Sequence, residues 1–175
     1  GNSKTAIAYE ALYNTREVRT WRLSPDNASV APKLIESRNF QDAYSHPGDP
    51  VMTQGRYGWQ VILLSEREDI YLNGRGASPE GVYPFLDRFS LTSGVKERLW
   101  TSPEGGFSRG TRVLDAEAKQ FIVRKESKTE PGNYWLHSKE LSDPKALSHF
   151  SDPLPLYNDI HKEFVRYPRP DGLEL

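Results

Sequence analysis

The glycine-rich segment Leu72–Gly94, LNGRGASPEGVYPFLDRFSLTSG, raises the first chemical question, because glycine loops can cradle a phosphate. Its spacing differs from the dinucleotide-binding fingerprint: Gly81 follows Gly76 by five positions, whereas the fingerprint requires three and must open a helix. Residues 84–87, Pro-Phe-Leu-Asp, indicate a strand instead, and the Gly-Lys-Ser/Thr of a P-loop is missing. We therefore expect these glycines to turn the chain between two strands.

Arg75 lies at the predicted tip of this loop. Its guanidinium could bind a carboxylate or another substrate group, because loops often carry binding residues. The alternative is an ordinary solvated arginine. Arg75 is therefore the one possible substrate contact that we take from the loop.

The histidines and serines lack the spacing of known catalytic or metal sites. No His-x-x-x-His or His-Glu-x-x-His occurs, and no Gly-x-Ser-x-Gly elbow exposes a serine. The chain has no cysteine, which excludes disulfides, thiolate catalysis and cysteine zinc sites. We expect no catalytic, metal-binding or cofactor-binding residue, and no cofactor. The histidines are His46, His137, His149 and His161.

Scattered carboxylates leave one enzymatic alternative open, since paired acids can hydrolyse glycosides when the fold brings them together. The sequence spacing does not show that any two of them meet. The candidates are Asp42, Asp49, Asp69, Glu80 and Asp87.

Four tryptophans could stack on sugars or bases. Trp21, Trp100 and Trp135 lie in predicted strands, however, where packing is the expected role; the fourth is Trp59.

The elements that position these residues are predicted to be β-strands. Thirteen glycines and 13 prolines interrupt the chain, and no long window has helical spacing. Short runs of β-forming residues alternate with turn-forming segments such as Ser-Pro-Asp-Asn at 24–27. The predicted strands cover residues 4–12, 16–23, 33–36, 60–66, 69–72, 85–91, 95–100, 119–127, 134–138 and 146–150.

These strands recur in units of about four strands and roughly 40 to 50 residues, the size of a propeller blade. We predict an all-β fold of about three antiparallel four-stranded blades, an incomplete β-propeller over residues 4–156. After it, a strand at 161–167, a turn and a strand cut short at 171–175 are expected. The blades are placed at about 4–45, 50–104 and 106–153, with junctions at 45–50 and 102–106.

Composition names no partner. With 23 basic and 24 acidic residues and a formal net charge of -1, no global field attracts nucleic acid or an acidic membrane. No apolar run approaches the about 20 residues that cross a bilayer, and no signal peptide is visible. We expect a soluble chain with no nucleic-acid or membrane partner; cytoplasm, periplasm and plastid stroma all stay open as compartments.

Long stretches of the sequence resemble the prolyl oligopeptidase-type serine peptidases, in particular their glutamyl endopeptidase branch of chloroplasts and bacteria. The resemblance runs in order from about residue 4 to the end. It is carried by AYEALYNTREVRTWRL (8–23), DAYSHPGDPVM (42–52), residues 72–100, RKESKTEPGNYWL (124–136) and KEFVRYPRPDGLEL (162–175).

The resemblance implies that the chain is the last part of an N-terminal β-propeller and that residues 157–175 begin the linker and first hairpin of an α/β-hydrolase domain. In that family the catalytic Ser, Asp and His lie in the hydrolase domain, after Asp171-Gly172. The chain alone is therefore expected to be inactive, although the longer protein would be a peptidase that cleaves after Glu. The propeller would gate access to the active site.

The implied partners are peptide substrates of the longer protein, the hydrolase domain, and other copies that pair through open blade edges. A glutamate substrate suits a basic partner. The arginines considered for it are Arg56, Arg67, Arg75, Arg88 and Arg109.

Two other classes stay open at this point. One is a free-standing β-propeller-like module that binds a protein partner through edges and loops. The other is a small β-rich enzyme that uses the scattered carboxylates.

Overall fold

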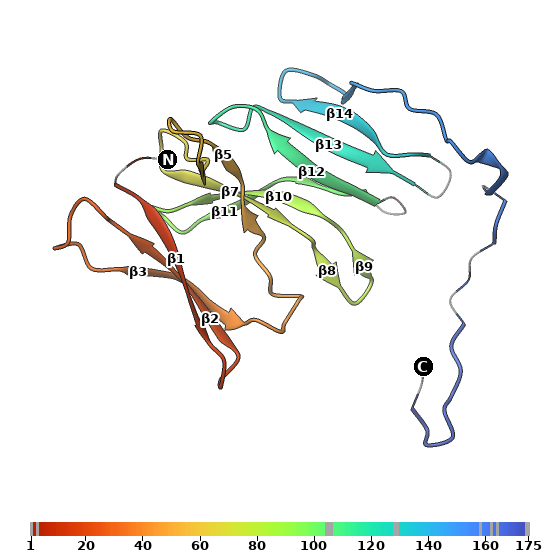
Figure 1. Cartoon of the computed structure of the whole chain (residues 1–175), viewed down its shortest axis with the longest axis horizontal. Helices are drawn as coiled ribbons and strands as arrows, with labels where there is room; N and C mark the ends of the chain where they lie inside the picture. Colours follow the sequence, from red (N-terminus) through yellow and green to blue (C-terminus); the bar gives the residue numbers. More distant parts are fainter. Residues whose placement is uncertain are drawn as a thin grey trace.

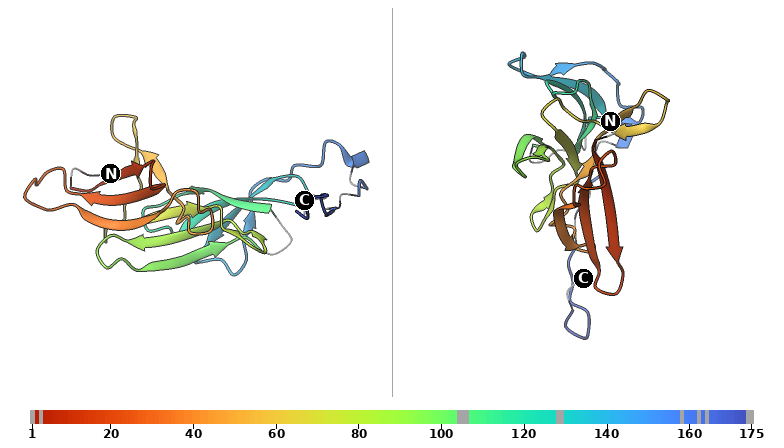
Figure 2. Two further views of the ribbon diagram at one scale, coloured as in Figure 1. Left: turned by 90° about the horizontal axis from the view of Figure 1, so that it is seen from below. Right: turned by 90° about the vertical axis from the view of Figure 1, so that its left-hand side faces the viewer.

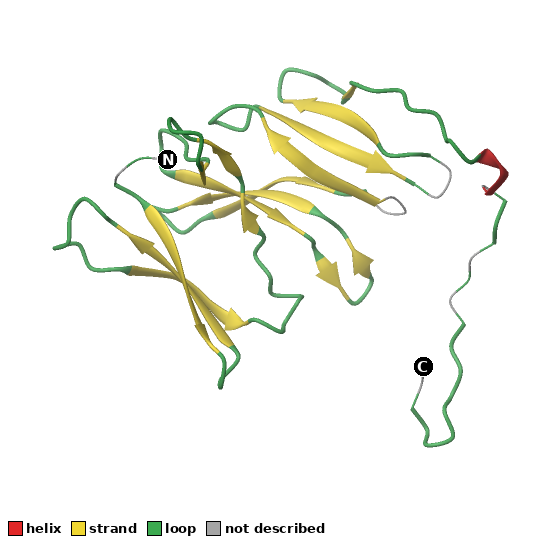
Figure 3. Cartoon of the chain, viewed as in Figure 1, coloured by secondary structure: helices red, strands yellow, loops and turns green. Residues whose placement is uncertain are grey.

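The computed structural model describes residues 2, 4–103, 107–127, 130–157, 159–161, 163 and 165–173. Apart from one 3₁₀ turn, η1 (Pro155–Tyr157), the regular elements in these ranges are β-strands (Figures 1 and 3). All of the strand pairs are antiparallel, and none of the described sheets is closed. The predicted all-β class is confirmed. Within the same ranges, no helix is long and apolar enough to cross a membrane.

Three main sheets follow one another along the chain, and within each the strands stand in chain order. The first sheet comprises β1 (Ala6–Leu12), β2 (Glu17–Leu23) and β3 (Lys33–Asn39). The second sheet comprises β4 (Asp49–Pro50), β7 (Asp69–Gly74), β10 (Phe85–Ser90) and β11 (Lys96–Thr101). The third sheet comprises β12 (Phe107–Val113), β13 (Gln120–Glu126), β14 (Asn133–Ser138) and β15 (Lys145–Ala146).

Two small hairpins, each a separate two-stranded sheet, lie in the chain between strands of the second sheet. They are β5 (Met52–Gln54) with β6 (Gln60–Ile62), and β8 (Ala77–Ser78) with β9 (Gly81–Val82). Figure 1 shows the three sheets side by side, and the left view of Figure 2 shows that they form an elongated row. The described residues after β15 extend away from the sheets.

The second sheet lies between the other two and is covered on both faces. In β7, Ile70, Tyr71 and Leu72 are all buried, with exposed fractions of 3%, 0% and 7%. Ile70 and Leu72 belong to one hydrophobic core, whereas Tyr71 belongs to the other. A strand buried on both faces has consecutive apolar residues rather than alternating ones, which is the pattern of this segment.

The core between the first and second sheets contains Ile70, Leu72 and Leu91, with Ile7 and Ile35 packed against it. Hydrogen bonds also connect the two sheets at the edge of this core. Arg22 Nη2 donates to both carboxylate oxygens of Glu68 at 2.9 Å, and Lys33 Nζ donates to the carbonyl oxygen of Thr92 at 3.2 Å. These contacts join β2 and β3 to the turns that flank β7 and β10.

The core between the second and third sheets is larger. It contains Tyr71, Leu86, Ala118, Phe121 and Val123. The Tyr71 hydroxyl donates to the carbonyl oxygen of residue 116 at 3.0 Å. Burial, and after it the nearby acidic side chains at 117 and 69, raise the pKa of Tyr71 to about 12, so this hydroxyl stays protonated as a donor.

His137 lies at the same sheet-to-sheet contact. Its ring stacks on Phe121, with 5.1 Å between centroids, and meets Trp100 edge-on at 6.1 Å. Burial lowers the pKa of His137, because the charged imidazolium loses its solvation there.

The stability of the chain should therefore decrease below about pH 6.5. The lowered pKa means that the unfolded chain binds a proton at His137 where the folded chain does not, so acid favours unfolding. We expect His137→Phe to have a smaller difference in Tm between about pH 7.5 and about pH 5.5 than the unmodified chain. A His149→Phe variant, at an exposed position, is the control. An unchanged difference in the His137 variant would contradict the assignment.

Most predicted strands are present, with shifted ends. The strand predicted at 60–66 is shorter, ending at Ile62, and only Lys145–Ala146 is strand where 146–150 was predicted. The described residues of 161–167 are in no strand, which corrects that prediction, while Lys162 and Phe164 lie outside the described residues. The turn predicted between 167 and 171 lies slightly later, where the Arg169 N–H donates to the Leu173 carbonyl oxygen at 2.8 Å, and residues 171–173, predicted as strand, are in no strand. Residues 104–106, in the predicted second junction, and residues 174–175 also lie outside the described residues.

Candidate ligand-binding cavity

The glycines of the 72–94 segment make close backbone contacts. Gly76 has a φ of 64°, and a Cβ there would lie 1.9 Å from the Tyr83 carbonyl oxygen. The Tyr83 N–H donates to the Gly76 carbonyl oxygen at 2.8 Å. At Gly74 a Cβ would lie 2.1 Å from Cζ of the Phe85 ring. These contacts confirm that the glycines shape the connection between β7 and β10.

Arg75 is exposed in this connection, directly after β7. It makes no ion pair with any residue in the described ranges. It is also not among the side chains that line the cavity described below. Arg75 stays a candidate substrate contact.

The histidines are dispersed. The Gly48 N–H donates to His46 Nδ1 at 3.1 Å, His149 is exposed, and His161 pairs with Glu163 at 3.2 Å. Among the residues that the structure describes, no three His, Asp or Glu side chains gather where they could hold a metal ion.

The five candidate carboxylates have separate surroundings. Asp87 is buried, with 1% of its surface exposed, and pairs with Arg98. Asp69 is buried at the start of β7, whereas Asp42 and Glu80 are exposed in turns. Asp49 lines the cavity described next.

The four tryptophans also have different surroundings. Trp100 packs against the core between the second and third sheets, as predicted, whereas Trp59 is 78% exposed at the turn of the β5–β6 hairpin. Trp21 Nε1 donates to Glu10 within the first sheet at 3.2 Å. Trp135 lies beneath the Lys125 ammonium, 5.8 Å from the ring centroid.

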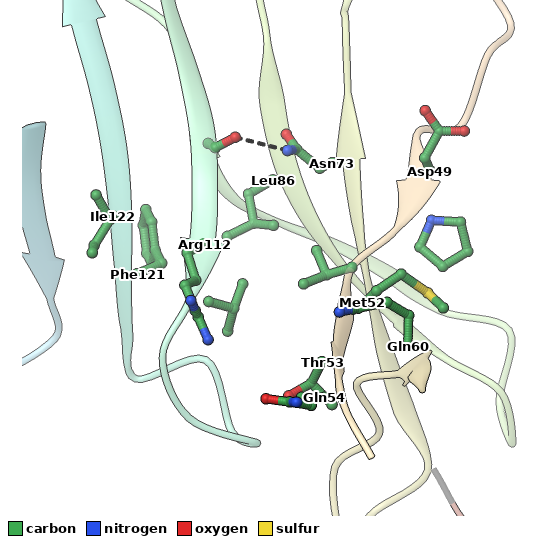
Figure 4. Close-up of a pocket in the computed structure, with 14 residues that line it drawn as sticks. Asp49, Met52, Thr53, Gln54, Gln60, Asn73, Leu86, Arg112, Phe121 and Ile122 are labelled. Carbon is green, nitrogen blue, oxygen red and sulfur yellow. Dashed lines mark hydrogen bonds between the residues drawn. The ribbon is translucent and has the colours of Figure 1, made fainter. Parts of the chain in front are cut away.

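A cavity of about 520 Å³ lies where the edges of the second and third sheets meet, and we call it the inter-sheet cavity (Figure 4). Its walls come from β4, the β5–β6 hairpin, β12 and β13. Leu86 and Phe121 contribute apolar surface. Its polar side chains are Asp49, Thr53, Gln54, Gln60, Asn73 and Arg112.

The edge strands β4, of the second sheet, and β12, of the third sheet, both line the cavity. Asn73 Nδ2 donates to the Gly110 carbonyl oxygen at 2.8 Å, which ties β7 to β12 across the cavity. Gly110 has no side chain to separate them: a Cβ there would lie only 3.2 Å from Asn73 Oδ1. A bulge between Gly110 and Arg112 then changes the register of β12 on β13.

Arg112 is the basic group of the cavity. Figure 4 shows its side chain on the third-sheet side, with Gln54 and Gln60 on the other side and Asp49 at a separate edge. Arg112 is exposed and makes no ion pair with any residue in the part of the chain that the structure describes. The arrangement can therefore attract a negatively charged group into a polar cavity.

Arg112 is not one of the five arginines considered from the sequence. Arg88 pairs with Glu97, Arg56 lies 5.6 Å above the Tyr57 ring, and Arg67 and Arg109 are exposed. The strand that contains Arg112 was not predicted, so the side of the sheet on which Arg112 lies could not be predicted either. Of residues 115–118, which form the turn before β13, only Asp115 favours turns, so the sequence carried little signal that another strand precedes them.

Comparison with proteins of known sequence gives extensive matches. The chain is 36% identical over 183 aligned residues, 97% of its length, to a protein of Oryza sativa subsp. japonica named "Probable glutamyl endopeptidase, chloroplastic". It is 34% identical over 184 residues, again 97% of its length, to a protein of the same name from Arabidopsis thaliana. The chain is related to the glutamyl endopeptidases. This confirms the resemblance seen in the sequence.

The chain spans about a fifth of these glutamyl endopeptidases, 20% of the rice protein and 19% of the Arabidopsis protein. No family model matches the chain, and no solved structure matches it. The relation to glutamyl endopeptidases therefore rests on the sequence similarity itself.

Proposed function

We propose that this chain is the non-catalytic β-sheet portion of a serine endopeptidase of the prolyl oligopeptidase type, in which it gates and shapes access to an α/β-hydrolase active site. The longer protein would cleave peptides after Glu. The observation that carries the proposal is the similarity of 97% of the chain to only about a fifth of the named glutamyl endopeptidases. The remaining length of such proteins leaves ample room for a separate catalytic domain.

We further propose that the three main sheets are propeller blades, at about residues 4–45, 50–104 and 106–153. Supporting this, the second and third sheets are each four-stranded meanders, and successive sheets pack through shared hydrophobic cores. Neighbouring propeller blades have this architecture. Residues 157–175 would then lead into the hydrolase domain.

Gating fits the position of the inter-sheet cavity. In each four-stranded sheet the first strand in the chain, β4 or β12, forms one edge, and the cavity lies between these two edges. First strands of blades line the central channel of a propeller. A substrate that reaches the active site through such a channel would pass these residues, and selection would depend on its size and charge.

The test compares the full-length protein with the 175-residue chain on fluorogenic peptides that contain Glu or Gln at one position. We expect cleavage by the full-length protein alone, and only after Glu, because the chain would lack the catalytic residues. Short peptides should be cleaved much faster than a folded protein substrate. Cleavage by the short chain would overturn the non-catalytic assignment, and equal rates on peptide and folded protein would overturn gating.

A free-standing interaction module is the second candidate, and one observation favours it. The β5–β6 hairpin presents Tyr57 and Trp59 at its turn, with exposed fractions of 81% and 78%. Exposed aromatic pairs of this kind are common at protein interfaces. Full-length protein without peptidase activity, together with a protein partner lost on replacing Trp59 by Ala, would favour the module.

A further inference from the structure

We propose that the inter-sheet cavity binds an acidic side chain of a peptide, and that Arg112 supplies the cation for it. This inference rests on the proposed peptidase function and deepens it by naming the substrate class of the cavity. It concerns recognition before catalysis, on the β-sheet portion itself.

The charge of Arg112 is available to a ligand. It stands on β12 at the cavity wall, and its guanidinium makes no ion pair within the described residues. By contrast, Arg88, Arg98 and Arg124 of the same two sheets each pair with a carboxylate. A guanidinium presents two parallel N–H donors, which match the two oxygens of a carboxylate.

The rest of the cavity suits a peptide. Its volume of about 520 Å³ is within the range of ligand cavities, roughly 300 to 1,000 Å³. Gln54 and Gln60 face Arg112 from the β5–β6 hairpin (Figure 4), and each side-chain amide can both donate to and accept from a peptide backbone. Met52, which is 47% exposed, and Val113 provide apolar surface in the cavity for the aliphatic part of a bound side chain.

Asp49 sets the polarity of the site. Its carboxylate lies at a different edge of the cavity from Arg112 (Figure 4). It repels an acidic side chain there and attracts a positive or N–H-bearing group of the same peptide. A bound peptide is thus oriented with its acid towards Arg112.

The experiment measures binding by fluorescence anisotropy, on full-length protein treated with a fluorophosphonate that blocks an active-site serine. Two labelled peptides are used, identical except for Glu or Gln at one position. We expect Arg112→Gln to weaken binding of the Glu peptide about 10-fold and to leave the affinity for the Gln peptide nearly unchanged. Arg112→Lys should lose less affinity for the Glu peptide than Arg112→Gln does, because lysine keeps the positive charge. Asp49→Asn should increase the affinity for the Glu peptide about 2-fold, because the repulsion between the two carboxylates is removed.

Arg109→Gln is the matched control, since Arg109 is exposed on the same strand and does not line the cavity. It should leave both affinities unchanged. Equal loss in the two arginine variants, or an unchanged Glu preference in Arg112→Gln, would overturn the inference. The binding assay does not require activity, so it also decides the inference in a protein that cleaves nothing. If the full-length protein cleaves after Glu while Arg112→Gln keeps its full preference, only this inference fails.

Discussion

Replacing Gly76 by Ala should lower the free energy of unfolding by about 3 kcal/mol. Two costs combine at this position. The backbone has a φ of 64°, which residues with a side chain rarely adopt, and the new Cβ would lie 1.9 Å from the Tyr83 carbonyl oxygen. That oxygen belongs to the backbone, so the segment itself must move, and the 2.8 Å bond between residues 83 and 76 is disturbed. Chemical denaturation followed by tryptophan fluorescence measures the change.

Gly94→Ala separates the two costs. Gly94 has a similar φ of 76°, but nothing lies within 4 Å of a Cβ built there. We expect a loss of only about 1 kcal/mol, from the backbone conformation alone. Equal decreases in the free energy of unfolding of the two variants would show that the close contact between residues 76 and 83 does not contribute to the effect.

Replacing Arg98 by Met should lower the free energy of unfolding by about 2 to 4 kcal/mol. Asp87 of β10 is 1% exposed and forms an ion pair with Arg98 of β11. The guanidinium also lies 4.0 Å above the centroid of the Phe85 ring. Without Arg98 the carboxylate stays buried and loses its charged partner, which is costly in a low-dielectric interior. Because Arg98 is itself half exposed, we expect the lower part of this range.

Arg88→Met provides the comparison on the neighbouring strand. It breaks the ion pair with Glu97, whose side chain is 49% exposed, so water replaces the lost partner. The expected loss is below about 1 kcal/mol. In addition, Asp87→Leu combined with Arg98→Met should recover much of the loss, because no buried charge remains. A small effect of Arg98→Met, similar to that of Arg88→Met, would contradict the interpretation.

Strands with apolar alternation or β-branched runs could be predicted from the sequence, and strands stabilised mainly by their neighbours could not. β12 shows the reason. Ser108 is buried and Gly110 lies against Asn73, so two covered positions of this strand carry small residues, and only Val113 at its end packs an apolar side chain against the core in the part that the structure describes. β4 is only two residues long and contains Pro50, which argues against a strand in isolation.

The site was less predictable than the fold. Arg75 stands out in the sequence because glycines flank it, but local sequence does not tell whether a loop faces a cavity. Arg112 was hidden because the cavity forms only when edges about 60 residues apart in the chain, around 50 and 112, lie together. The roles of Gly74 and Gly76 as turn and contact residues, in contrast, follow from local spacing, and that prediction is confirmed.

The double burial of β7 also determines how the molecule can open. Ile70 and Leu72 are covered by the first sheet and Tyr71 by the third, so neither outer sheet can detach without exposing one side of this strand to water. Loss of one outer sheet removes one of the two cores, whereas unfolding of the middle sheet removes both. We therefore expect a short linear array in which each sheet is stabilised by its neighbours and the two outer sheets open more easily than the middle one.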